Sequence, residues 1–215
     1  MQFNEAQIQA IQHNTGPCMV IAGPGSGKTT VLTHRVRYLI ERYGVNPSDI
    51  LVITFTKAAA EQMKLKFKGL SEGRNSAVTF GTFHAVFFTI LKAAYNYSAH
   101  CIIKPQIQHE FVKDQMCRLE LEYDDENEAV AGVLSEISCV KGEDVNIDEY
   151  ESRCIPPQSF RIMYRAYDDM LVRKHLIDFD DMIVQCRELL MQREDYRRAW
   201  QNKYCLLYTS PSPRD

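Results

Sequence analysis

A glycine-rich segment at residues 22–29 has the most specific chemistry in the chain. Ala22-Gly-Pro-Gly-Ser-Gly-Lys28-Thr29 follows an apolar run and precedes a segment with helical spacing. It matches the phosphate-binding pattern G-x-x-x-x-G-K followed by Ser or Thr, except that Ala22 occupies the first glycine position. Backbone N–H groups of such a loop surround an anion, and glycines leave space for the phosphates. The segment therefore predicts a nucleoside triphosphate site, in which Lys28 contacts phosphate and Thr29 ligates Mg²⁺.

Two further clusters combine hydroxyl, aromatic and basic side chains at the ends of expected strands. The first is Thr54-Phe55-Thr56-Lys57, and the second is Gly81-Thr82-Phe83-His84. Ligands of doubly wound sheets bind at the carboxyl ends of the strands, and aromatic, hydroxyl and ammonium groups suit single-stranded nucleic acid. As an alternative, the two phenylalanines are core residues and His84 caps a helix.

Alternating apolar runs and helical stripes position these residues. Three runs, at 18–22, 50–55 and 78–80, have the composition of buried strands. Segments with helical spacing follow them at 31–43, 59–70 and 87–94. Because parallel strands need helix-length crossovers, we expect an α/β fold with a parallel sheet covered on both faces.

The part of the chain from 92 to 177 lacks such strands and is expected to be helical, and further helical stripes lie at 160–171 and 179–190. Within it, residues 119–152 contain twelve acidic residues and one basic residue, Lys141. We expect this stretch to be a solvated face or a mobile loop, with a charged partner site as the alternative.

Composition limits the class of protein. The longest apolar run, at 18–22, is far shorter than the roughly 20 residues that span a bilayer, and the N-terminus does not have the pattern of a secretory signal. We therefore expect a cytoplasmic protein without a membrane partner. Residues 1–104 carry a net charge of +6 and residues 105–215 a net charge of −9, so a polyanion would be attracted to the first half. The seven scattered cysteines suggest neither a zinc site nor a disulfide framework.

Five motifs, taken in order, resemble the UvrD/Rep/PcrA group of superfamily 1 DNA helicases and are also similar to the AddA/RecB helicase-nuclease subunits. They are F-N-x-x-Q at 3–7, A-G-P-G-S-G-K-T-T at 22–30, I-T-F-T-K-A-A-A-E-Q-M at 53–63, G-T-F-H at 81–84 and D-F-D-D-M-I at 178–183. The resemblance implies a P-loop NTPase (RecA-like) fold with an inserted helical subdomain, which uses ATP and Mg²⁺ and binds single-stranded DNA.

The resemblance also implies roles for individual residues. Lys28 and Thr29 are the expected catalytic residues, with Thr29 at the metal, and Gln7 contacts adenine, although by residue type alone Gln7 is more often a surface side chain. The expected nucleotide-binding residues are Gln7, Ala22, Gly23, Pro24, Gly25, Ser26, Gly27, Lys28, Thr29 and Thr30. The expected DNA-binding residues are Thr54, Phe55, Thr56, Lys57, Thr82, Phe83 and His84.

Three segments are expected from the same resemblance, and a fourth from the codons that the last residues allow. Residues 1–91 form the first part of the motor domain, 92–177 the inserted helical subdomain, and 178–204 a return to the motor domain that stops before the acidic Walker B pair. Residues 205–215 can be back-translated into a sequence resembling a transposase adaptor of sequencing libraries, so we expect adaptor read-through there.

The implied function is the N-terminal ATP-binding part of a 3′ to 5′ DNA helicase or translocase acting in repair or recombination. Repair or recombination proteins are possible partners. Without the acidic pair, a second motor domain and an arginine finger, the fragment alone is expected to be inactive. Two alternatives are a helicase-nuclease subunit and a non-translocating P-loop kinase, and the kinase leaves the two strand-end clusters unexplained.

Overall fold

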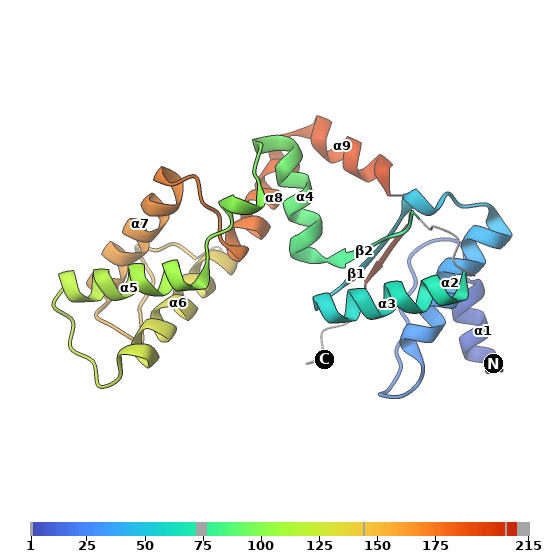
Figure 1. The fold of residues 1–215 in the computed structure, drawn as a ribbon, viewed down its shortest axis with the longest axis horizontal. Helices are drawn as coiled ribbons and strands as arrows, with labels where there is room; N and C mark the ends of the chain where they lie inside the picture. Colours follow the sequence, from blue (N-terminus) through green and yellow to red (C-terminus); the bar gives the residue numbers. More distant parts are fainter. Residues whose placement is uncertain (1, 72–76, 144, 205, 210–215) are drawn as a thin grey trace. The chain divides into compact units, whose positions relative to one another are not determined.

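The computed structural model describes residues 2–71, 77–143, 145–204 and 206–209, which group into two compact units (Figure 1). The sheet unit comprises Met1–Val86 and Glu194–Asp215, and the helical unit comprises Phe87–Arg193. The resemblance places the boundaries between motor domain and inserted helical subdomain at 91/92 and 177/178, and these boundaries stay a prediction. Of the segment 205–215 that is expected to be adaptor-derived, residues 206–209 form a strand, and residues 205 and 210–215 lie outside the described residues. The adaptor origin of the segment stays a prediction.

A small parallel sheet forms the centre of the sheet unit. Its three strands are β1 (Ile50–Thr54), β2 (Thr79–Thr82) and β3 (Leu206–Thr209), in the order β2-β1-β3. Every residue of β1 is buried, as expected for the central strand of a parallel sheet. The strands predicted at 50–55 and 78–80 are confirmed to within one or two residues, and so is the α/β class. The finer assignment to a RecA-like P-loop fold stays a prediction.

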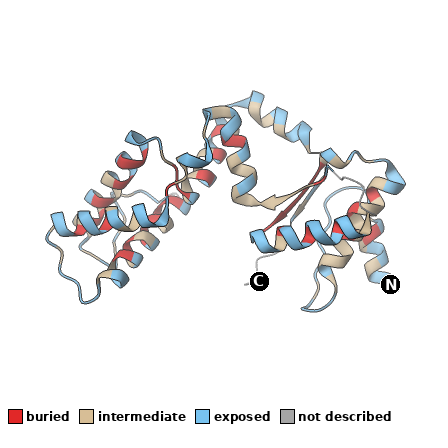
Figure 2. Cartoon of the chain, viewed as in Figure 1, coloured by how far each residue is buried: buried red, intermediate tan, exposed pale blue. Residues whose placement is uncertain are grey.

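Helices on the sheet provide the core of this unit. They include α1 (Glu5–Gln12), α2 (Lys28–Tyr43), α3 (Lys57–Leu70) and α9 (Glu194–Lys203), and α4 (Phe83–Tyr95) begins here and continues into the helical unit. The core is made by the apolar faces of α2 and α3 against β1, with Val36, Ile50, Val52, Met63, Phe67 and Val78 at its centre. The helical segments predicted from spacing at 31–43, 59–70 and 87–94 are confirmed. In Figure 2, β1 is buried, and α3 has buried residues on one side and exposed residues on the other.

The strand predicted at 18–22 is wrong. Residues 18–22 form no regular element, and the side chains of Met19 and Ile21 are 85% and 90% exposed. Apolar composition favours a strand only where a neighbouring strand provides hydrogen-bond partners. The described sheet consists of β2, β1 and β3, and residues 18–22 form no hydrogen-bonded ladder with any of these strands.

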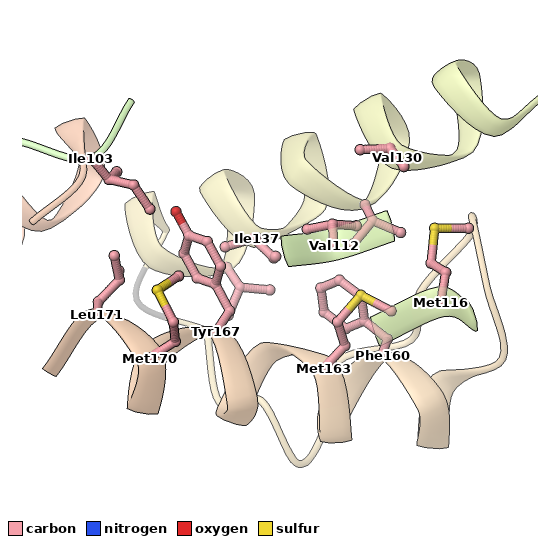
Figure 3. Close-up of a cluster of buried hydrophobic side chains, with 12 residues drawn as sticks. Ile103, Val112, Met116, Val130, Ile137, Phe160, Met163, Tyr167, Met170 and Leu171 are labelled. Atoms are coloured by element: carbon pink, nitrogen blue, oxygen red, sulfur yellow. The ribbon is translucent and has the colours of Figure 1, made fainter. Parts of the chain in front are cut away.

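The helical unit has its own core. It contains α5 (Pro105–Arg118), α6 (Glu126–Gly142), α7 (Pro157–Arg173) and α8 (Phe179–Gln192). Figure 3 shows Phe160, Met163 and Tyr167 of α7 pointing toward Val112 and Ile137 of the neighbouring helices. The helical character expected for 92–177 is confirmed; its only strand-like pairing in the described residues is the isolated bridge between Ile102 and Ile177.

A buried ion cluster lies within this unit. Lys141 Nζ donates to Asp178 Oδ2 at 2.9 Å and to Asp181 Oδ1 at 2.6 Å. The Tyr167 hydroxyl donates to Asp178 Oδ2 at 3.2 Å and accepts a hydrogen bond from Gln108 Nε2 at 2.6 Å. Burial raises the pKa of the Tyr167 hydroxyl, which keeps it protonated and able to donate to the carboxylate.

The acidic stretch 119–152 is therefore not all solvated loop. Most of its described acidic side chains are exposed or half-buried, as expected, but the stretch includes α6, on which Glu136 and Lys141 are buried. Glu136 accepts hydrogen bonds from Ser152 Oγ at 2.5 Å and from the Arg153 backbone N–H at 2.7 Å. The mobile-loop alternative is wrong for α6, which is a helix whose apolar side packs into the core, whereas a solvated face is confirmed for its described acidic side chains except Glu136.

Two expectations from composition, on membrane spans and on cysteines, can be compared with the described residues. No helix among them combines the length and apolar character needed to cross a membrane. The cysteines in this part of the chain are free thiols.

Candidate functional site

The phosphate loop enters α2 through two glycines in the left-handed region. Gly25 has φ of 75° and Gly27 has φ of 82°, a conformation that is strained for residues with a Cβ. Gly27 is the N-cap of α2 and provides no side-chain cap. The first N–H groups of a helix have no partner within the helix, so those of α2 are placed to bind an anion.

Lys28 lies over its own loop. Its Nζ donates to the carbonyl oxygens of Ala22 at 2.8 Å and Gly23 at 3.4 Å, and the residue is exposed. These acceptors are neutral, and a phosphate oxygen is a stronger acceptor for an ammonium group. The structure therefore holds the Lys28 ammonium at the loop, where an entering phosphate can replace the carbonyl partners.

Gln7 reaches the same loop from α1. Its Nε2 donates to the Ser26 carbonyl at 3.0 Å, and its Oε1 accepts from the Asn4 backbone N–H at 3.0 Å. Asn4 Oδ1 accepts from the Gln7 backbone N–H at 2.8 Å, which completes a capping box at the start of α1. Asn4 was not among the predicted site residues, although the N-x-x-Q spacing is a signal for this box.

A pocket of about 420 Å³ opens beside the loop, a volume within the range of small-ligand sites. Its described lining comes from α1, the segment 16–22, the loop, α2 and β3. Lys28 and Arg35 are its cations, and no carboxylate is among its described lining residues, so the pocket suits a polyanion.

Arg35 is a pocket residue that sequence reasoning missed. Its guanidinium donates to the Ala10 carbonyl at 3.0 Å and lies 5.4 Å from the centre of the Tyr208 ring. Its partners are separated from it by 22 residues or more along the chain, so spacing gave no signal.

Thr29 also lines the pocket, and its hydroxyl is the metal ligand predicted from the sequence. No group of three or more His, Cys, Asp or Glu side chains suited to a metal occurs within the described part of the chain. The donors at the loop therefore fit Mg²⁺ that enters with a triphosphate and keeps phosphate and water ligands, as Mg²⁺ commonly does.

The two strand-end clusters meet at one edge of the sheet. Thr54 and Thr82 are register partners at the ends of the parallel strands β1 and β2. The Thr54 hydroxyl is buried and donates to the Thr56 carbonyl at 2.8 Å, while Thr56 Oγ1 accepts from the Ala59 N–H at 3.2 Å and caps α3. Thr82 Oγ1 accepts from the Ala85 N–H at 3.3 Å in the first turn of α4.

The aromatic and basic members of these clusters differ in exposure. Phe55 is 59% exposed, so the alternative that it is a core residue is wrong. Lys57 is also exposed and lies 3.9 Å from Glu61. Phe83 and His84 are half-buried at the start of α4. The structure thus brings the predicted DNA-binding residues to one edge, and their roles stay a prediction.

Comparison with known proteins gives a consistent result. The model of the UvrD/REP helicase N-terminal domain matches residues 3–208. The ATP-dependent DNA helicase Rep of Escherichia coli K12 is 33% identical over 94% of this chain and 31% of that protein. The putative ATP-dependent DNA helicase YjcD of Bacillus subtilis 168 is 31% identical over 94% of this chain and 27% of its own length.

A third relative is also named as an ATP-dependent DNA helicase. The ATP-dependent DNA helicase PcrA of Staphylococcus epidermidis is 29% identical over 94% of this chain and 28% of its own length. The chain thus spans 27–31% of the length of these three relatives.

Proposed function

Because the chain belongs to the UvrD/REP helicase family through its N-terminal domain, we propose that it is the ATP-binding part of a DNA helicase. In this proposal the whole protein moves 3′ to 5′ along single-stranded DNA, in repair or recombination. The observation that supports it most directly is the phosphate loop, with left-handed Gly25 and Gly27 and with Lys28 at a pocket whose described lining includes no carboxylate.

The loop residues divide the work of binding the nucleotide. The N–H groups at the start of α2 donate hydrogen bonds to phosphate oxygens. Lys28 exchanges its carbonyl partners for the β and γ phosphates. Thr29 holds Mg²⁺ through its hydroxyl, and the metal neutralises charge on the phosphates when it is bound. Gln7, already at the loop, is placed to contact the base as well.

Nucleic acid binds, in this proposal, at the sheet edge where β1 and β2 end. The exposed Phe55 ring offers a surface for a base, and Lys57 an ammonium for a phosphate. The starts of α3 and α4 lie at the same edge and provide further N–H donors. The proposed nucleotide site and the proposed DNA site thus belong to one unit, as a translocating motor requires.

A first test concerns turnover by the 215-residue chain itself. We expect it to bind ATP but to hydrolyse it negligibly, because the described pocket lining has no carboxylate to orient an attacking water. Release of inorganic phosphate, measured with and without a single-stranded oligonucleotide, checks this. Oligonucleotide-stimulated turnover would contradict the expected inactivity, whereas absence of ATP binding would contradict the proposed nucleotide site.

Phe55→Ala tests the proposed DNA edge. We expect it to weaken binding of a single-stranded oligonucleotide by about 1–3 kcal/mol, because one base loses its stacking partner. Fluorescence anisotropy with a labelled oligonucleotide measures the change. Tyr43→Ala, which removes another exposed aromatic of the sheet unit, is the matched control and should leave affinity unchanged. Equal losses in both variants would argue against a base-stacking role for Phe55.

A further inference from the structure

Gln7 is hydrogen-bonded to the phosphate loop from within the protein. Its Nε2 donates to the Ser26 carbonyl at 3.0 Å, across 19 residues of sequence. The same atom is the nearest neighbour, at 3.5 Å, of the space where a Cβ on Gly27 would lie. The amide end of Gln7 therefore lies directly against the part of the loop that enters α2.

The carboxamide is itself fixed at its other end. Asn4 N–H donates to Gln7 Oε1 at 3.0 Å, and Gln7 N–H donates to Asn4 Oδ1 at 2.8 Å. The bond to Oε1 restricts the Gln7 side chain before it reaches the loop, so little further side-chain entropy is lost when Nε2 contacts Ser26. Gln7 thus acts as a short rigid link between α1 and the loop.

This link has a consequence for the anion-binding groups. In a planar trans peptide the C=O and N–H point in opposite directions, so holding the Ser26 carbonyl toward Gln7 directs the Gly27 N–H away from Gln7. The segment contains three glycines, at 23, 25 and 27, and glycine gives a loop many alternative conformations. One hydrogen bond to a carbonyl at its centre removes many of these alternatives.

We propose that Gln7 is a positioning residue of the phosphate loop, which strengthens binding of the triphosphate itself whatever base it carries. The inference rests on the proposed nucleotide site and extends it. A carboxamide has two N–H donors and two acceptor lone pairs, of which Gln7 uses one each within the protein. A contact with adenine through the remaining groups is therefore compatible with the positioning role and separable from it.

Ligands with and without a base separate the two roles. We would titrate the chain with ATP and with inorganic tripolyphosphate by calorimetry, for wild type, Gln7→Met and Gln7→Glu. Both variants should weaken tripolyphosphate by about three- to tenfold, the usual effect of one lost hydrogen bond, and should weaken ATP by at least that factor, since ATP also loses the proposed contact with the base. Gln7→Glu keeps the acceptor for the Asn4 N–H, so it preserves the α1 cap while losing the donor to Ser26.

The matched controls are Gln9→Met and Gln9→Glu, which make the same changes at an exposed position of α1. They should leave both Kd values unchanged. If Gln7→Met weakens ATP alone and tripolyphosphate binds as to wild type, Gln7 serves only the base and the inference is overturned.

Hydrogen exchange without any ligand provides an independent measurement. Amides of residues 22–29 should exchange faster in Gln7→Met than in wild type, while those of β1 and the temperature midpoint of unfolding stay the same. Unchanged exchange in the loop would overturn the inference. A wild-type chain that binds neither ligand would instead refute the proposed nucleotide site, and the exchange result would still decide whether Gln7 orders the loop.

Discussion

Lys28→Ala is expected to weaken ATP binding to the chain by roughly 10- to 150-fold, the equivalent of about 1.5–3 kcal/mol for hydrogen bonds to a charged group. The Lys28 ammonium is held over the loop by neutral carbonyls of Ala22 and Gly23, at 2.8 and 3.4 Å. Removing it takes away the charged donor for phosphate and also the two bonds that order the start of the loop. Calorimetric titration with ATP and with tripolyphosphate measures both losses.

Two comparisons make this result specific. Lys66→Ala removes the same charge from an exposed position on α3 and should leave ATP affinity nearly unchanged. Lys28→Ala itself should bind a single-stranded oligonucleotide as well as wild type, because the proposed DNA edge uses different atoms. An ATP affinity within twofold of wild type would show that Lys28 does not contact the phosphates.

The features that the sequence predicted correctly are mostly local. The turn of the phosphate loop depends on glycines at 25 and 27, whose left-handed conformation follows from residue type. The helices could be predicted because the apolar spacing that indicates each one lies within a single short segment. The meeting of Thr54 and Thr82 followed from one added premise, that strands joined by a helix lie parallel with their carboxyl ends together.

The features that the sequence did not predict depend on distant partners. The apolar run at 18–22 has the composition of a strand, but a strand also needs a partner strand, and the described sheet of β2, β1 and β3 does not include this run. Gln7 and Ser26 are 19 residues apart, and Lys141 lies 37 and 40 residues from its carboxylates. From the sequence, Lys141 is a single lysine in an acidic stretch and is expected to be solvated. Only the packing of α6 against α8 shows that it is buried between two carboxylates.

That buried lysine gives the largest expected effect on stability. Lys141→Met should lower the free energy of unfolding by about 3–5 kcal/mol, because it leaves two carboxylates without their cation. The side chains of Asp178 and Asp181 are only 5% and 14% exposed, so water replaces the lost ammonium poorly. Denaturant unfolding followed by circular dichroism measures the change.

Burial and pairing can be separated with two further variants. Lys113 lies 2.6 Å from Glu126, the same distance as Lys141 from Asp181, but both side chains are largely in water, at 53% and 34% exposure. Lys113→Met should therefore change stability little. The triple variant Lys141→Met, Asp178→Asn, Asp181→Asn should recover most of the loss, because it removes the buried charges and Asn still caps α8 at position 178.

The size of the Lys141→Met effect should also depend on pH. Burial raises the pKa of Asp181 from 3.8 to about 6, with the charge of Asp178 adding to it and that of Lys141 opposing it. The folded state therefore binds this proton more tightly than the unfolded state does. The stability it contributes is complete below pH 3.8 and is lost as pH rises through 6, up to about 3 kcal/mol.

Without the ammonium, the pKa of Asp181 should rise further, because the attraction that favours its charged form is gone. At pH 4.5 the Asp181 carboxyl is then protonated, so the variant loses less stability than at pH 7.5, where Asp181 adds a second buried carboxylate without its cation. The difference in unfolding free energy between Lys141→Met and wild type should thus grow across this range. In the Asp181→Asn background it should grow much less, since the remaining carboxylate has no charged neighbour at position 181. A difference independent of pH would show that Lys141 stabilises the unit by packing and not by its charge.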